Sequence, residues 1–269
     1  MKGGLLKASS SRKRSNRGDT VVEGVYIVGF NGSPRKYGNT FKMLKVALLA
    51  AEREGARTRL INLYDCDIRP CLGCLTDEQT SCRYPCVIDD DMKWIYDEIL
   101  KADGIIIATP VYWYNVSGPV KNFIDRLTAF ENMICLGDKS WVEGKVAGVI
   151  AVGNDSGVIE VIANLFAVLN CMGFIIPPWA LAYKNTMKSL DEERDRLLDA
   201  ANVGRCLTIM AKIARDYDGD WYSTKLAKWL SKNYKRVLAE AEANRKIQEA
   251  LREKLIQKIA TKEVVRESR

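Results

Sequence analysis

Four cysteines in the first third of the chain have a spacing that suits chemistry at sulfur. They follow the pattern C-x2-C-x7-C-x3-C, as Cys71, Cys74, Cys82 and Cys86. Thiolates gathered in one loop can hold an iron–sulfur cluster or a structural zinc ion. Free thiols or a redox-active pair fit the spacing as well, so the residues alone leave these interpretations open. The other cysteines stand in apolar or helical surroundings, where we expect buried packing roles: Cys66, Cys135, Cys171 and Cys206.

A polar loop after the apolar run 25–30 has the composition of an anion-binding turn. It reads NGSPRKYGNT, and its residues of interest are Gly32, Ser33, Arg35, Gly38, Asn39 and Thr40. The glycines permit tight turns, and the hydroxyls and the guanidinium can bond an anion. Asn39 or Thr40 is expected to cap the following helix, whose free N–H groups favour a phosphate. The loop is neither a Walker A nor a G-x-G-x-x-G motif, and an ordinary strand-to-helix connection has a similar composition.

Two further loops carry candidate binding residues. The loop after residues 104–109 contains Pro110, Val111, Tyr112, Trp113, Tyr114 and Asn115. Aromatic rings can stack on a flat ligand, and the prolines and glycine of this stretch mark a loop rather than a packed element. After residues 145–152 comes GNDSG, where Asn154 and Ser156 are weaker candidates.

The amino-acid composition excludes several kinds of catalytic and metal site. The chain has no histidine, which excludes Ser-His-Asp and Cys-His catalysis and any histidine metal ligand. The net charge of +7 lies at the two ends, while residues 23–216 are slightly acidic. A solvated tail and a charged helix face are the simplest account of the basic ends, so nucleic acid is not the expected partner.

Short apolar runs alternate with helical periodicity along the middle of the chain. Strands are expected at 25–30, 57–63, 104–109 and 145–152 and from 174–176, and helices at 40–54, 90–101, 120–130, 158–172 and 191–216. Near-continuous apolar strands that alternate with helices predict an α/β fold with a parallel sheet covered on both faces. Ligands of such sheets bind at the carboxyl ends of the strands, where the three loops lie.

The loops resemble those of a known family. GSPRKYGNT is similar to the GSPR-x-x-(G/S)-N-(S/T) phosphate loop of the NADPH-dependent FMN reductase family, which includes the iron–sulfur flavoproteins. The segment from Thr109 resembles the family's flavin loop, together with Lys121, Asp125 and Arg126 in the next helix. The resemblance covers about residues 24–215. It implies a flavodoxin-like three-layer sandwich with a five-stranded parallel sheet of order 2-1-3-4-5.

The resemblance implies FMN as the cofactor. Ser33, Arg35, Asn39 and Thr40 would hold its phosphate, and the loop 110–115 would lie along its ring. NAD(P)H would then reduce the flavin, which would pass electrons to free FMN, a quinone or another acceptor, either a small molecule or a protein. The alternative is an iron–sulfur flavoprotein that carries electrons between proteins without oxidising NAD(P)H. The intact phosphate loop argues against a scaffold that has lost FMN.

The cysteine pattern departs from this family in one position. Cys71, Cys74 and Cys86 match the PC-x-GC…C…DDM frame. In iron–sulfur flavoproteins a third cysteine follows the second by three residues, where this chain has Asp77. Cys82 would have to replace that ligand of a [4Fe–4S] cluster.

The ends of the chain predict two extensions around the domain 23–216. Residues 1–22 are polar and basic and are expected to form a disordered arm. Residues 217–269 predict an amphipathic helical extension, with a candidate break at Ala243-Asn244. Packing on its own domain or on a sister subunit, contact with another protein, and contact with a membrane surface all remain open for this helix.

The cellular location and the oligomeric state are predicted from weaker features of the sequence. The first residues lack the apolar core of a signal peptide, so we expect a cytoplasmic protein. The apolar stretch 158–183 is interrupted by polar residues and by Pro177-Pro178, so no membrane span is expected. A homodimer or homotetramer is implied by the family resemblance alone.

Overall fold

A computed structural model describes residues 24–267. Five parallel strands form one sheet in the order β2-β1-β3-β4-β5. The strands are β1 (Tyr26–Asn31), β2 (Arg57–Asn62), β3 (Gly104–Pro110), β4 (Val146–Gly153) and β5 (Leu181–Asn185). The predicted flavodoxin-like order is therefore confirmed. The reversal of strand order beside β1 creates the crevice in which such sheets bind ligands.

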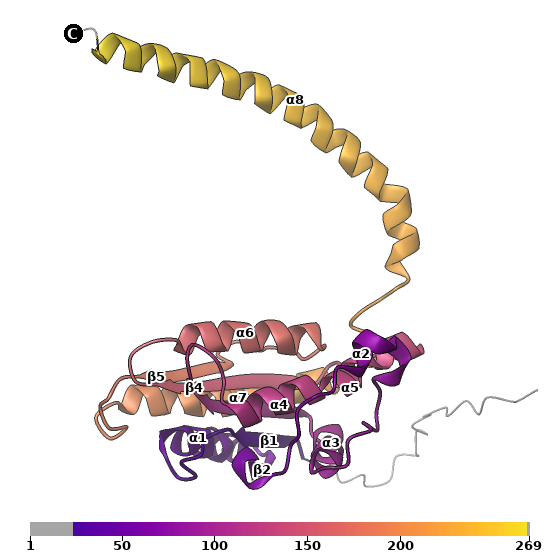
Figure 1. Ribbon diagram of the computed structural model, residues 1–269, viewed down its shortest axis with the longest axis vertical. Coiled ribbons are helices and arrows are strands. Elements are labelled where there is room, and N and C mark those ends of the chain that lie inside the picture. Colours follow the sequence, from indigo (N-terminus) through magenta and orange to yellow (C-terminus); the bar gives the residue numbers. More distant parts are fainter. Residues whose placement is uncertain (1–23, 268–269) are drawn as a thin grey trace, which may run out of the picture. The chain divides into compact units, whose positions relative to one another are not determined.

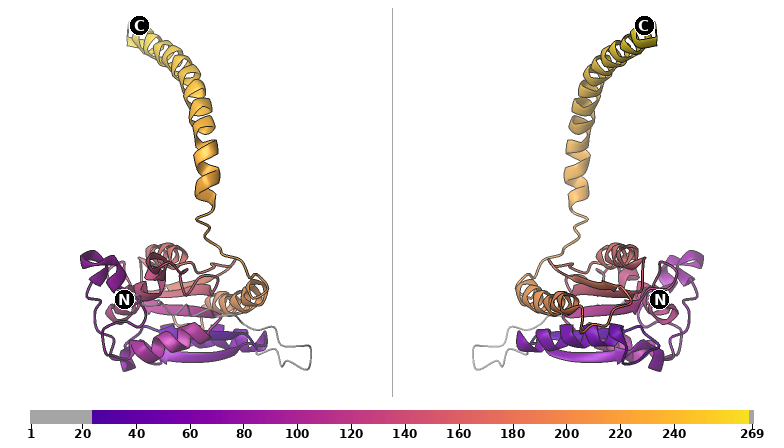
Figure 2. Two further views of the ribbon diagram at one scale, coloured as in Figure 1. Left: turned by 90° about the vertical axis from the view of Figure 1, so that its right-hand side faces the viewer. Right: turned by 90° about the vertical axis from the view of Figure 1, so that its left-hand side faces the viewer.

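Helices cover both faces of the sheet (Figures 1 and 2). The longer ones are α1 (Asn39–Arg53), α3 (Met92–Lys101), α4 (Gly118–Arg126), α6 (Val158–Cys171) and α7 (Arg194–Ala214). One core cluster joins the sheet to α1 and α7, and the other joins it to α3, α4 and α6. Neighbouring residues of one strand enter opposite clusters, as Ile106 and Ile107 do. Central strands buried on both faces explain the continuous apolar runs in the sequence.

Short helical turns complete the connections. They are α2 (Cys74–Asp77), α5 (Thr128–Glu131) and three 3-10 turns at Leu63–Asp65, Gln79–Ser81 and Asn132–Leu136. The single helix expected over 120–130 is thus divided between α4 and α5, with Leu127 between them. Both parts lie on the same core face, so the apolar pattern continued across the division.

The prediction of a strand at 174–176 was wrong. Only Ile175 makes an isolated bridge, to Val146, and the fifth strand begins later, at Leu181. Pro177 and Pro178 lie between the two, and proline cannot donate to a strand ladder. The apolar residues before the prolines fill the core at the start of the sheet instead.

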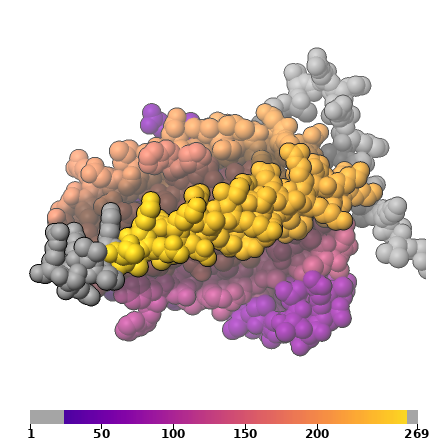
Figure 3. Space-filling view, turned by 90° about the horizontal axis from the view of Figure 1, so that it is seen from above, coloured from indigo at the N-terminus to yellow at the C-terminus, as the bar shows by residue number. Residues whose placement is uncertain are grey.

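The C-terminal residues form a separate compact unit, which divides from the first unit between Gly219 and Asp220. Most of it is one long helix, α8 (Leu226–Glu267), which Figure 1 draws as a curved, unbroken helix and Figure 3 draws with its atoms. The candidate break at Ala243-Asn244 does not occur, since both residues are helical. No helix among residues 24–267 is long and apolar enough to cross a membrane. The predicted arm, residues 1–22, lies outside the described residues.

Candidate functional site

The loop after β1 is tied directly to the neighbouring strand β3. The Gly32 amide donates to the Ala108 carbonyl at 2.7 Å, and the Ser117 hydroxyl donates to the Gly32 carbonyl at 2.6 Å. A Cβ on Gly32 would stand 2.1 Å from a methyl group of Val120, so this position requires glycine. Because Ser117 is the N-cap of α4, the loops after β1 and β3 form one connected structure.

The loop 32–38 is folded on its own polar groups. The Ser33 hydroxyl accepts from the Arg35 amide at 3.2 Å, and the Gly38 amide donates to the Arg35 carbonyl at 2.8 Å. Ser33 and Thr40 are buried, whereas the Arg35 side chain is exposed. The loop therefore presents two hydroxyls inside a turn whose rim carries the guanidinium.

The start of α1 differs from the prediction in one respect. Gly38 is the N-cap, and Asn39 and Thr40 are the first helical residues, so neither of them caps the helix. No side chain caps this end within the described chain, and the first-turn amides of α1 have no acceptor there. Amides at a helix N-terminus, beside the buried Thr40 hydroxyl, are an arrangement that suits an anion.

The loop after β3 contains a tight hairpin turn. The amides of Tyr112 and Asn115 each donate to the other residue's carbonyl, at 2.9 and 3.0 Å. The two residues between them, Trp113 and Tyr114, adopt φ angles of 51° and 60°. Non-glycine residues in the left-handed region cost about 1–2 kcal/mol each. The turn holds Trp113 95% exposed and Tyr114 59% exposed, which leaves their rings available to a ligand.

The loop after β4 lies against that turn. A Cβ on Gly157 would stand 2.9 Å from Val111 and 3.2 Å from the Tyr114 backbone, and Gly157 has a φ of +83°. Asn154 and Ser156 are exposed on the same short loop. The Val111 amide donates to the Val152 carbonyl at 2.9 Å. The three loops that carry the sequence-predicted residues therefore meet at the carboxyl edge of the sheet.

Four polar residues at this edge were missed by the sequence reasoning. The Asn31 side chain accepts from the Ser33 amide at 3.3 Å and donates to Asn62 at 2.9 Å. The Thr109 hydroxyl accepts from the Ser117 amide at 3.2 Å. Asn185, at the end of β5, donates to the Asp155 carbonyl at 2.9 Å. Asn31 and Thr109 could have been found from the sequence, because each is a polar residue near the end of a buried apolar strand.

These features fit the phosphate and the ring of a flavin better than they fit loops that only connect strands to helices. The first-turn amides and two buried hydroxyls match a phosphate in charge and hydrogen-bonding capacity. The Asn185 side-chain oxygen is buried without a hydrogen-bond partner in the described chain, beside Gly153. A buried acceptor of this kind calls for a donor from outside the chain.

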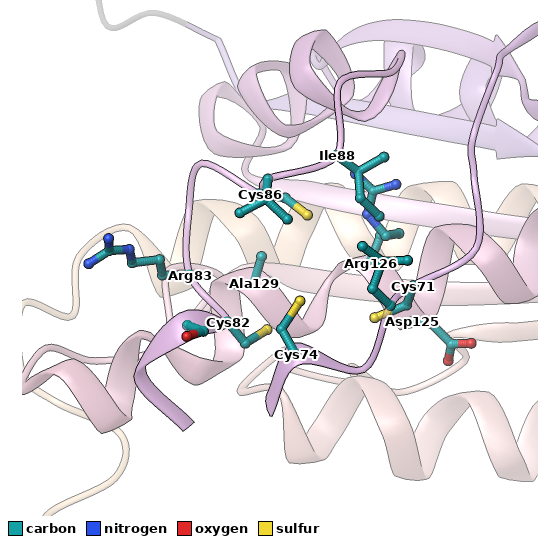
Figure 4. Close-up of a pocket in the computed structure, with 12 residues that line it drawn as sticks. Cys71, Cys74, Cys82, Arg83, Cys86, Ile88, Asp125, Arg126 and Ala129 are labelled. Carbon is teal, nitrogen blue, oxygen red and sulfur yellow. The ribbon is translucent and has the colours of Figure 1, made fainter. Parts of the chain in front are cut away.

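The predicted cysteine ligands line one pocket beside the end of α4 (Figure 4). Cys71, Cys74, Cys82 and Cys86 surround a small cavity of about 20 Å³, with Arg126 and Ala129 in its wall. Burial and the neighbouring thiols raise the pKa of Cys82 to about 11, which keeps this side chain a protonated thiol near neutral pH. Four thiolates are nevertheless a donor set that zinc and iron–sulfur clusters use. Among residues 24–267, however, no three Cys, Asp or Glu side chains converge in a metal-holding arrangement.

A buried ion pair holds both ends of the cysteine loop. Arg126 and Asp90 are 2.6 Å apart, with side chains 1% and 0% exposed. Arg126 also donates to the Arg69 carbonyl at 3.1 Å, and the Arg69 amide donates to Asp90 at 2.9 Å. Burial would raise the pKa of Asp90, but the hydrogen bonds from Arg126 and from backbone amides outweigh it and lower that pKa.

Two of the cysteines expected to be buried are exposed. Cys135 lies in the 3-10 turn after α5, and Cys171 is the last residue of α6. Both elements have an apolar inner face, and these two positions fall outside it. Cys66 and Cys206 are partly buried.

Comparison with known proteins decides the family. A family model described as NADPH-dependent FMN reductase matches residues 25–186. The chain belongs to this family. It is 33% identical over 193 residues to an iron-sulfur flavoprotein of Methanosarcina thermophila, covering 66% of this chain and 95% of the relative.

Further similarities agree with the assignment to the FMN reductase family. An iron-sulfur flavoprotein of Archaeoglobus fulgidus is 34% identical over 157 residues, which is 58% of this chain and 67% of the relative. The solved structure of RosB with its bound intermediate 8-demethyl-8-formylriboflavin-5'-phosphate superposes with a TM-score of 0.63. It is 19% identical and covers 79% of this chain and 88% of RosB, so it establishes the shared fold. The protein is an FMN-binding oxidoreductase with a flavodoxin-like fold.

Proposed function

We propose that the protein uses NAD(P)H to reduce FMN held at the carboxyl edge of its sheet. The first turn of α1 and the side chains of Ser33, Arg35, Asn39 and Thr40 would hold the phosphate. The loops 110–115 and 154–156 would bind the ring. The observation that carries this proposal is the meeting of three loops from distant parts of the sequence, connected through Gly32, Ser117 and Gly157.

Each part of the chain has a distinct task in this proposal. Bound FMN supplies the capacity to accept a hydride and to release electrons one or two at a time. Gly38 lets the loop turn into α1, so that backbone amides face the phosphate. Exposed Trp113 and Tyr114 offer aromatic faces to the flavin and to a nicotinamide. The chain needs no acid or base for this chemistry, which agrees with its lack of histidine.

The second candidate function is electron relay through an iron–sulfur cluster. Cys71, Cys74, Cys82 and Cys86 would be its ligands, and the pocket that all four line favours this candidate. The names of the two curated relatives support it as well. The loop would have to close around the cluster, because the four side chains do not converge as they stand.

The proposal also includes the electron acceptor, the cellular location and the oligomeric state. The electron acceptor is a small molecule, such as free FMN or a quinone, or another protein. A cytoplasmic location suits eight reduced cysteines, since every one of them is a free thiol in the structure. The family resemblance supports a homodimer or homotetramer.

One experiment tests these proposals together. The protein is purified without oxygen, and its absorption spectrum is recorded before and after NADPH or NADH is added, with iron and acid-labile sulfide measured on the same sample. We expect flavin bands that bleach on adding NAD(P)H. Flavin that bleaches only with dithionite, together with iron and sulfide, would replace the reductase with the electron carrier. A protein that takes up no FMN would contradict both.

A further inference from the structure

After its first residue, Asp220, the C-terminal unit has a long basic stretch that contains no acid. Residues 221–239, called the basic segment here, contain Lys225, Lys228, Lys232, Lys235 and Arg236 and no aspartate or glutamate. None of the five cations pairs with a carboxylate in the part of the chain that the structure describes. Within the helical part of the segment, these charges stand free in solvent.

The remainder of α8 has a different charge pattern. Residues 240–261 mix acids and bases, and Arg245 forms ion pairs with Glu242 at 2.8 Å and with Glu249 at 2.5 Å. Such pairs one turn apart are typical of a helix that satisfies its own charges in solvent. The basic segment therefore differs from the rest of the same helix in a specific way.

The apolar and basic side chains of the segment occupy separate faces. An α-helix turns by about 100° per residue, which places Leu226, Leu230 and Val237 within about 40° of one another. Lys228, Lys232 and Lys235 fall on the opposite side by the same count. The large apolar residues in the helical part of the segment are 49–61% exposed: Leu226, Trp229, Leu230, Tyr234, Val237 and Leu238. The face extends over about three and a half helical turns, and Asn233 is a polar residue within it.

Aromatic residues stand at the borders of the apolar face. By the same helical count, Trp229 lies between the leucines and the lysines, and Tyr234 lies toward the other border. Trp and Tyr prefer the interface between hydrocarbon and water because one end of each ring system is polar. Lysines beside the apolar face can extend their ammonium groups toward lipid headgroups.

We propose that the basic segment binds the surface of a membrane that contains anionic lipids, with residues 226–239 of α8 lying in the plane of the headgroups. An apolar face, an opposite face whose only charges are basic, and border aromatics are the combination that interfacial helices use. A second copy of the chain is a poorer occupant, because it would bring two acid-free cationic segments together. Nucleic acid would use the charges but leave the leucines in water.

The test uses the full-length protein and vesicle flotation, so its result does not depend on FMN. One vesicle preparation is phosphatidylcholine alone, and the other contains about one third phosphatidylglycerol. We expect the protein to float with the anionic vesicles, to stay behind with the neutral ones, and to be released by raised salt. Failure to float with anionic vesicles, or equal flotation with both preparations, would overturn the proposal.

Matched variants locate the binding on the helix. K228Q/K232Q/K235Q should weaken partitioning about a hundredfold, since each basic residue near an anionic surface contributes about fivefold. The control K246Q/K254Q/K258Q removes the same charge further along α8 and should bind nearly as well as the original chain. Trp229→Ser should weaken partitioning roughly tenfold, and Ile247→Ser should have little effect. Circular dichroism checks that each variant keeps its helix content.

Other occupants give different results in the same experiments. A control triple variant that loses binding as strongly as K228Q/K232Q/K235Q would overturn the assignment to the basic segment. Tight, segment-dependent binding to a homopolymer RNA without flotation would assign the face to nucleic acid. A sedimentation change from dimer to monomer in Trp229→Ser, without flotation of the original chain, would assign it to a second copy.

Discussion

Ser33 and Thr40 are the buried hydroxyls beside the free amides of α1, and their contribution can be separated from that of the flavin ring. Ser33→Ala and Thr40→Val should each weaken FMN binding roughly tenfold or more, since a hydrogen bond to a charged group contributes about 1.5–3 kcal/mol. The measurement is the Kd for FMN by fluorescence quenching.

Riboflavin provides the control for this prediction because it lacks the phosphate. Its Kd should change little in either variant, so the preference for FMN over riboflavin should collapse. Equal losses for both ligands would mean that the substitutions disturb the fold or the ring site instead.

Asp90 is the residue whose charge the cysteine loop depends on. Asp90→Asn leaves Arg126 as a buried cation without its carboxylate, which should cost about 3–5 kcal/mol of unfolding free energy. Urea denaturation measures the loss. Asp125→Asn is the control, because it breaks the exposed pair with Lys121 on the same helix and should cost less than about 1 kcal/mol. Similar losses in both variants would contradict the role assigned to burial.

The pH dependence of the Asp90 contribution has a definite sign. The pKa of Asp90 is lowered in the folded protein, whereas an aspartate in the unfolded chain has a pKa of about 3.9. The stabilisation is therefore complete above the unfolded value and is lost as the pH falls toward the folded pKa. The stability difference between the original chain and Asp90→Asn should stay constant from neutral pH downward and shrink only below about pH 4. Urea midpoints at several pH values measure it.

At this scale the sequence indicated candidate loop residues but not their partners. Ser33, Thr40 and Trp113 could be singled out because loop composition and strand ends are local properties, and their roles in binding FMN stay a prediction. Asn185 and the pairing of Asp90 with Arg126 depend on contacts between residues far apart in sequence. Such contacts appear only when the sheet is assembled.

Among the elements, α1 and α7 approach each other most closely at a glycine. A Cβ on Gly204 would stand 1.8 Å from the Ala47 carbonyl oxygen. Gly204→Ala should therefore destabilise the protein by about 1–3 kcal/mol, although alanine is intrinsically better in a helix by about 1 kcal/mol. Urea denaturation is the measurement, with Leu198→Ala on the exposed side of α7 as the control. A gain in stability on adding the methyl group would show that the helices can separate without penalty.

The elements themselves were predicted well where their pattern was long and strong. The buried runs of β1, β3 and β4 and the periodic helices α1 and α6 agree with the structure to within a residue or two. The error at 174–176 arose because apolar residues before two prolines serve the core without joining the sheet. The N-cap at Gly38 was missed because a glycine cap leaves no side-chain signature.

For the whole molecule, the two compact units should be separable. Both core clusters draw their residues from positions 25–211, so among the residues whose burial is described no core residue comes from the C-terminal unit. A chain ending at Gly219 should keep its unfolding free energy and its Kd for FMN, the former within about 0.5 kcal/mol. The same chain should no longer float with anionic vesicles. Loss of FMN binding on truncation would mean that the C-terminal unit supports the flavin site.

The ion pair between Arg126 and Asp90 affects how readily the cysteine loop would bind a metal ion or cluster. Both partners also bond to the Arg69 backbone, so together they close the segment of about twenty residues between Arg69 and Asp90. Closing such a loop costs about 3 kcal/mol of chain entropy. This loss of chain entropy occurs when the flavin domain folds, before a metal would bind. If one of the four thiols bound a metal ion or cluster, the other three would already be held near it at a high effective concentration. In the proposed electron carrier, the folded domain would thus lower the entropic barrier to binding a cluster.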